Sequence, residues 1–353
     1  KVRFNRVSVR FFPPGLALEG VRFVYAKDGT RIETQAGELG VSVDFNVFGG
    51  HKTRIREIFL HEAWVTIDIP KSESSGEHPW DQIQNELAKL PVTIDALSIT
   101  DSRIESMGLS VDISSLRTTI GEKEIHFSGE VKDLAYEKIE HHVDLLRLEA
   151  SLTRDYLLFD NWTLLQKRSR VQGSGKLKFW AEVEKMEFEG PFKTDLYVAD
   201  VKEFLTLDPV HLDGGVLAAK GTASWSKARG PLASIDFDMN DLRSNVIHAK
   251  RIEGKIRTDA SRVVMEQYHF ENGTDRMDLL RPAVIWNQST KRLFPDGLKV
   301  QTEKLDLQNA LRFLGDTLKP LQGLVTGEID FYLDRFDMKF LPKAGAKLEN
   351  FGL

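Results

Sequence analysis

The densest group of side chains that could bind a metal ion lies between residues 137 and 144. It contains Glu137, Glu140, His141, His142 and Asp144. On a strand, His142 and Asp144 would share a face, because alternate residues point the same way. Carboxylates and imidazoles bind zinc or iron, but a solvent-facing strand also collects such residues. We therefore expect a polar surface here and no metal site.

A second segment, residues 172–177 (QGSGKL), has some features of a phosphate-binding loop. Arg170 stands where that motif needs its first glycine, and Leu177 follows the lysine where serine or threonine is needed. The serine between the two glycines also lacks the Gly-x-Ser-x-Gly spacing of a nucleophile elbow. No Ser/His/Asp arrangement stands out by spacing. The sequence thus predicts a protein that is not an enzyme and that uses no cofactor.

Composition describes a folded, water-soluble chain. Of the 353 residues, 41% are apolar and 29% are charged, which is too apolar for a disordered chain. The formal net charge of −5 gives no reason to expect nucleic acid as a partner. The absence of cysteine excludes a disulfide scaffold and a thiolate metal site, and it suits the cytosol or a bacterial periplasm.

What the chain does contain is a two-residue apolar period, repeated from end to end. In a strand this period places apolar side chains on one face and polar ones on the other. We expect the following residues to lie on one apolar face that lines a groove: Val41, Val43, Phe45, Ile99, Phe237, Met239, Ile329, Phe331 and Leu333. The alternative is that they form a sealed core.

The first seventy residues read as four or five strands, over residues 2–12, 16–25, 31–48 and 53–69. The apolar period slips by one residue between Phe4 and Val7, and again between 92–94 and 97–99. A slip would turn the apolar side chains to the wrong face unless a bulge absorbs it. We therefore expect bulges at both places.

Three short helices are expected, over residues 80–90, 200–207 and 306–318. The first has an apolar stripe of Ile83, Leu87 and Leu90 and follows a loop at 70–79; in the second, Asp200 is placed as the N-cap. Helices this short must dock on the sheet, either as plugs at the end of the apolar face or as ordinary amphipathic packing. The second and third helices each open a weak repeat, over residues 200–232 and 306–333.

Four segments resemble the bacterial AsmA-like proteins: residues 14–23 (PGLALEGVRF), 36–43 (AGELGVSV), 55–67 (IREIFLHEAWVTI) and 90–104 (LPVTIDALSITDSRI). The glycine patterns after Leu212 and Leu321 resemble the related TamB group. The resemblance implies a mainly β fold: an elongated, strongly curved antiparallel sheet that forms a U-shaped hydrophobic groove. It also implies that residues 1–353 form one segment of a longer protein.

The same resemblance implies the function and its setting. The protein would be periplasmic, anchored to the inner membrane by a segment absent from this sequence, and would carry phospholipid acyl chains towards the outer membrane. The alternative is a scaffold or chaperone for the assembly of outer-membrane proteins, which would offer an unprotected strand edge. A closed β-solenoid or an adhesin, with its apolar face sealed by its own side chains, is the third possibility.

Overall fold

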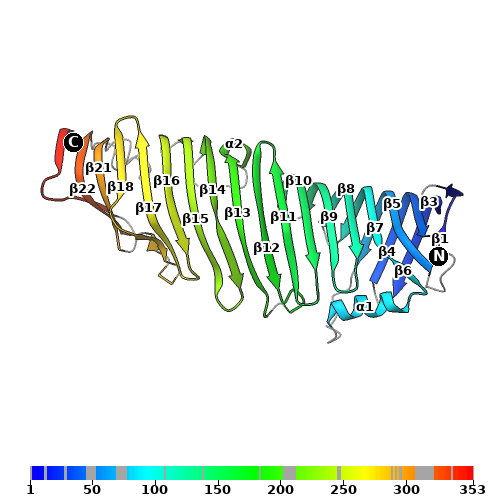
Figure 1. Cartoon of the computed structure of the whole chain (residues 1–353). Helices are drawn as coiled ribbons and strands as arrows, with labels where there is room; N and C mark the ends of the chain where they lie inside the picture. The colour runs from blue at the N-terminus through cyan, green and yellow to red at the C-terminus, as the bar shows by residue number, and fades with distance from the viewer. Residues whose placement is uncertain are drawn as a thin grey trace. The chain divides into compact units, whose positions relative to one another are not determined.

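The computed structural model describes residues 2–11, 14–27, 30–44, 53–68, 78–106, 109–136, 139–182, 184–201, 212–244, 248–287, 289–290, 292–293, 296–306, 322–334 and 337–352. Strands account for most of these residues, and the two helices among them are short (Figure 1). The prediction of a mainly β protein with a few short helices is confirmed at this level.

The chain divides into two compact units. Unit 1 contains Lys1–Gln166 and Ser174–Met186, and unit 2 contains Lys167–Gly173 and Glu187–Leu353. The expectation of one continuous segment over 1–353 stays a prediction.

The elements of unit 1 are β1 (Val2–Arg3), β2 (Arg6–Phe11), β3 (Pro14–Lys27), β4 (Thr30–Asp44), β5 (Thr53–Asp68), α1 (Pro79–Lys89), β6 (Val92–Ile94), β7 (Ala96–Ser106), β8 (Leu109–Ile120), β9 (Ile125–Tyr136), β10 (Ile139–Leu152) and β11 (Tyr156–Gln166). Strand β12 (Ser169–Lys178) has residues in both units. Unit 2 continues with β13 (Glu187–Tyr197), α2 (Val198–Val201), β14 (Leu212–Ser226), β15 (Gly230–Ser244), β16 (His248–Thr258), β17 (Arg262–Asn272), β18 (Asp275–Leu279), β19 (Ala283–Asn287), β20 (Arg292–Leu293), β21 (Leu298–Asp306), β22 (Gln322–Asp334), β23 (Asp337–Pro342) and β24 (Lys347–Gly352).

Most neighbouring strands pair antiparallel, as expected, but unit 1 contains an exception. Strand β5 pairs parallel with β6 and β7. Parallel neighbours need a crossover connection, because the chain must return to the end of the sheet from which it started. The segment that carries α1 supplies it. The expectation of an antiparallel sheet is therefore wrong at β5.

Helix α1 forms where the sequence places it, but its buried side chain is not the expected one. The His78 side chain caps the helix, because its Nδ1 accepts a hydrogen bond from the Trp80 N–H at 3.2 Å. Trp80 is buried, whereas Ile83 and Leu90 of the predicted stripe are exposed. An Arg154–Asp81 ion pair at 3.0 Å fixes the N-terminal turn to the β10–β11 hairpin. The helix is thus held by its first turn, at the ends of the strands (Figure 1).

The second predicted helix begins earlier than expected. Helix α2 starts at Val198, so Asp200 lies inside it and is not the N-cap. The Asp200 carboxylate accepts hydrogen bonds from the Arg168 backbone N–H and Nη2, at 2.9 and 3.1 Å. This tertiary ion pair, and not local capping, explains the carboxylate at this position. Residues 202–207 and the third predicted helix from residue 307 onward lie outside the described residues.

The predicted bulges do not appear as register shifts, because β1 and β2 pair with β3 in one continuous register, and β6 and β7 pair with β5 in one continuous register. The first slip coincides with the break between β1 and β2 and the second with the break between β6 and β7. The first slip has counterparts in the neighbouring strands. In each of them, two successive residues of the same face are separated by two residues instead of the usual one. These positions are Leu18 and Val21 in β3, Ala36 and Leu39 in β4, Leu60 and Ala63 in β5, and Ile99 and Ser102 in β7. The extra residue in each strand keeps the apolar side chains together.

The two predicted repeats share a local feature at the start of their strands. Gly215 in β14 and Gly323 in β22 have φ values of +132° and +136°, which side-chain-bearing residues rarely adopt. The strand register is irregular beside both glycines. Each repeat therefore begins its strand with a bulge that only glycine accommodates easily.

Candidate functional site

The apolar side chains of unit 1 line up from strand to strand. The ladder register aligns Leu18, Leu39, Leu60, Ile99 and Leu116, on β3, β4, β5, β7 and β8. Residues directly opposite on paired strands lie on the same face of a sheet. The packed cluster on this face centres on small and branched side chains: Val21, Ala36, Ala63 and Val65 are buried, with Leu18, Leu39 and Leu60 packed against them.

Three predicted groove residues lie on this face. Val41 pairs with Leu16 and Ile58, Val43 pairs with Ile55, and Ile99 pairs with Leu60. All three side chains are half-buried. Phe45 lies outside the described residues.

Unit 2 has an apolar face built in the same way. Its register aligns Leu217, Met239, Ile252, Phe270 and Met277, on β14 to β18. Phe237 and Met239 are two residues apart on β15, so they share this face, and both are half-buried. The Phe237 ring covers Gly254, where an added Cβ would lie 3.0 Å from the ring.

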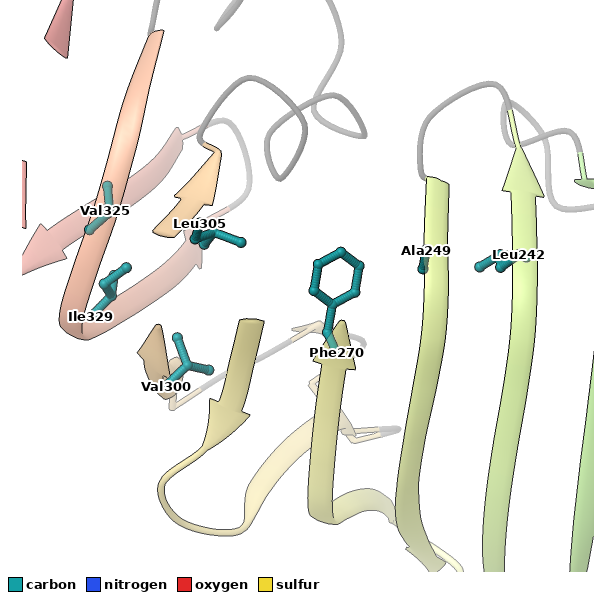
Figure 2. Packing of buried hydrophobic residues seen from close by; sticks show 7 residues of the cluster. All are labelled: Leu242, Ala249, Phe270, Val300, Leu305, Val325 and Ile329. Carbon is teal, nitrogen blue, oxygen red and sulfur yellow. The ribbon is translucent and has the colours of Figure 1, made fainter. Parts of the chain in front are cut away.

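Near the C-terminal strands this face becomes a closed core. Figure 2 shows its buried residues, which are Leu242, Ala249, Phe270, Val300, Leu305, Val325 and Ile329. The predicted groove residue Ile329 is fully buried in this cluster. Phe331 and Leu333 occupy alternate positions further along β22, and their side chains lie outside what the structure describes. Ile329 is thus fully buried, whereas Phe237 and Met239 on the same face are half-buried.

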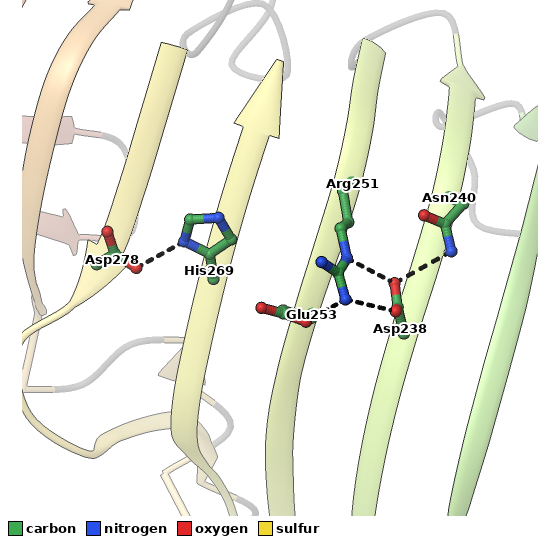
Figure 3. Close-up of polar contacts among 6 residues, drawn as sticks. All are labelled: Asp238, Asn240, Arg251, Glu253, His269 and Asp278. Carbon is green, nitrogen blue, oxygen red and sulfur yellow. Dashed lines mark hydrogen bonds and ion pairs between the residues drawn. The ribbon is translucent and has the colours of Figure 1, made fainter. Parts of the chain in front are cut away.

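The opposite face of unit 2 carries charges in cross-strand pairs. Arg251 donates to Asp238 through Nε and Nη2, at 3.2 and 2.8 Å, and its Nη2 lies 2.7 Å from Glu253 (Figure 3). On the next strands His269 Nδ1 lies 2.6 Å from Asp278 (Figure 3). Exposed pairs of this kind contribute little to stability, at most about 1 kcal/mol each. Their main effect is to make this face polar, so that it is solvated by water.

Asp330 departs from the expectation that polar residues between the apolar ones face water. It lies on the charged face, directly opposite Lys299 on β21, yet it is buried. Its carboxylate lies 2.7 Å from Lys343 Nζ and 3.7 Å from Lys299 Nζ. The hydrogen bond from Lys343 and the nearby positive charges hold the pKa of Asp330 below its ordinary value, against the opposing effect of burial. Asp330 is therefore a structural anchor.

The segment 137–144, the densest group of possible metal ligands, cannot be placed as a site. Residue 137 lies outside the described residues, as do the side chains of residues 140–142. Among the residues that the structure does describe, no group of three or more metal-ligating side chains comes together.

Comparison with known proteins assigns no family. No protein-family model matches the chain, and no curated protein is significantly similar to it. In the described part of the chain, neither helix has the length and apolarity needed to cross a membrane.

Proposed function

We propose that the chain binds phospholipid acyl chains along its apolar faces and serves as a conduit for them. The observation that carries the proposal is the register: in each unit, apolar side chains of successive strands align on one face. Many of them, including Val41, Ile99, Phe237 and Met239, are only half-buried by the described part of the protein. Each methylene removed from water contributes about 0.8 kcal/mol, so an acyl chain would bind such a face without polar specificity.

The resemblance to AsmA-like and TamB proteins supplies the setting of this proposal. It implies a U-shaped groove in the periplasm, lined by the apolar faces, with an inner-membrane anchor and transfer towards the outer membrane. About 20 strands stacked about 4.8 Å apart would give a sheet of about 96 Å. Its radius of gyration would be near 28 Å, against about 20 Å for a compact domain. Small-angle scattering that gave the compact value would count against the groove.

A second candidate is a scaffold that pairs with strands of outer-membrane proteins. The observation in its favour is β2, for which the described strands show pairing with β3 alone. Its apolar residues Val9 and Phe11 are 63% and 78% exposed. An edge strand with exposed apolar side chains is a template for strand addition.

Site-specific photo-crosslinking in cells tests the conduit. A photoreactive residue at Val43 or Phe237 should capture phospholipid. The matched controls are Asp44 and Asp236, the next positions along the same strands, which belong to the opposite face. Equal labelling of both faces, or no labelling, would remove the conduit and favour the scaffold. In that case a photoreactive residue at Val9 should capture another protein. Native mass spectrometry of the purified protein gives an independent test by detecting co-purified phospholipid.

A further inference from the structure

A hollow of about 890 Å³ follows the row of extra residues in unit 1. It is lined by consecutive residues of six long strands, by Arg3 of β1 and by Asn5, which follows β1. Among the extra residues that line it, Gly20, Glu62 and Asp101 have left-handed φ values of +61°, +50° and +47°. The last two carry side chains, for which this conformation costs about 1–2 kcal/mol each. Strain of this kind, repeated in neighbouring strands, gathers at functional sites.

One end of the hollow is cationic. Arg3 on β1 pairs directly opposite Arg22 on β3, and both residues are exposed. Neither forms an ion pair with any residue that the structure describes. Like charges in directly opposite positions destabilise a strand pair. A bound dianion would replace this repulsion with attraction, because guanidinium groups bind phosphate through paired, charge-assisted hydrogen bonds.

The middle of the hollow presents an aromatic ring. Trp64 lies two strands away from Arg22 through Gln35, a distance of about 10 Å at the usual strand spacing. It is 54% exposed, although tryptophan is a large apolar residue. The Arg103 guanidinium lies 5.9 Å from the centre of its ring and also contacts Glu105 and Asp112. Trp64 is thus held in place and offers apolar ring surface to a ligand.

The row of extra residues places hydrogen-bond acceptors beside this ring. Glu62 and Asp101 both line the hollow, and their side chains are 69% and 67% exposed. The His61 ring lies 3.7 Å from the Glu62 carboxylate and 3.6 Å from that of Asp101. Carboxylates accept hydrogen bonds from hydroxyl groups, and an apolar ring packs against the carbon face of a sugar.

We propose that this hollow binds a phosphorylated saccharide. The phosphate lies between Arg3 and Arg22, the sugar ring packs on Trp64, and the sugar hydroxyls donate to Glu62 and Asp101. The site stands on charged and aromatic side chains of the polar face of unit 1, so it does not depend on the proposed lipid conduit.

Isothermal titration calorimetry of the whole chain tests the site with three probes: glucose 6-phosphate, inorganic phosphate and glucose. The expected order of affinity is glucose 6-phosphate first, inorganic phosphate second, and glucose too weak to detect. The double variant R3Q/R22Q should weaken the binding of glucose 6-phosphate and of inorganic phosphate at least tenfold. W64A should reduce the affinity for glucose 6-phosphate to that for phosphate and leave phosphate binding unchanged. R117Q is the matched control, because Arg117 is an exposed arginine of unit 1 outside the hollow.

All four substituted residues are exposed, so the variants should fold, and an unchanged thermal midpoint verifies this. Equal affinity in wild type and R3Q/R22Q, or no detectable binding of glucose 6-phosphate, would overturn the proposal. Sedimentation with phosphatidic acid vesicles adds a further arm. Binding to these vesicles without binding to glucose 6-phosphate would place a lipid phosphate at the arginines and overturn the saccharide part.

Discussion

The contrast between Phe237 and Ile329 gives the sharpest test of whether the apolar face is open. Both residues belong to the apolar face of unit 2, and both were expected to line a groove. Phe237 is half-buried, whereas Ile329 is fully buried in the closed core. Replacing each by aspartate, in F237D and I329D, introduces the same carboxylate in two surroundings that differ in access to water.

The expected costs follow from burial. A fully buried large apolar side chain contributes about 1.5–3 kcal/mol, so half-burial at Phe237 places the loss near 1–1.5 kcal/mol if the new carboxylate stays hydrated. At Ile329 the carboxylate has no water and no partner, so the loss should reach about 4–5 kcal/mol or more. For a unit of this size, 1 kcal/mol shifts the thermal midpoint by about 2–4 °C. F237D should therefore lower the midpoint by about 2–6 °C, and I329D by more than about 10 °C.

Differential scanning calorimetry measures both shifts, with D236N on the opposite face as a control that should change little. If F237D is as destabilising as I329D, the face around Phe237 is a sealed core, and the argument for an acyl-chain path fails. If I329D is tolerated, the assignment of Ile329 to a closed core is wrong.

Three further outcomes are expected. Because the pKa of Asp330 is lowered in the folded state, its ion pair stabilises the fold above the ordinary carboxyl pKa, and this stabilisation is lost as pH falls through the lowered pKa. In urea unfolding, D330N should be less stable than wild type at neutral pH and equally stable in strong acid. W80A removes the buried side chain of α1 and should cost about 3–5 kcal/mol, or release the helix, which limited proteolysis would detect as cleavage within 79–89. In G40A the new Cβ would lie 1.9 Å from the Phe59 ring, so a loss of about 1–3 kcal/mol is expected; a double-mutant cycle with F59A should recover most of it, and additive losses would contradict the clash.

The period-two pattern determined much of the local structure. It predicted the strands and their two faces, because side-chain direction in a strand depends only on sequence position. It also located the two slips, but the bulges expected there are absent, because the partner strand carries a matching extra residue and the register stays continuous. Val41, Ile99, Phe237 and Met239 were assigned to apolar faces for the same reason, and the register places them there in each unit.

Which strands pair, and what covers each face, depends on contacts between residues far apart in the sequence. The parallel pairing of β5 with β7 requires the crossover through α1, which no local period encodes. The burial of Asp330 depends on Lys299 and Lys343, supplied by other parts of the chain. The hollow in unit 1 follows the row of extra residues, which the pairing of β3, β4, β5 and β7 aligns. Each slip is visible in a single strand, but only strand pairing, which fixes the register, brings the slips together into a site.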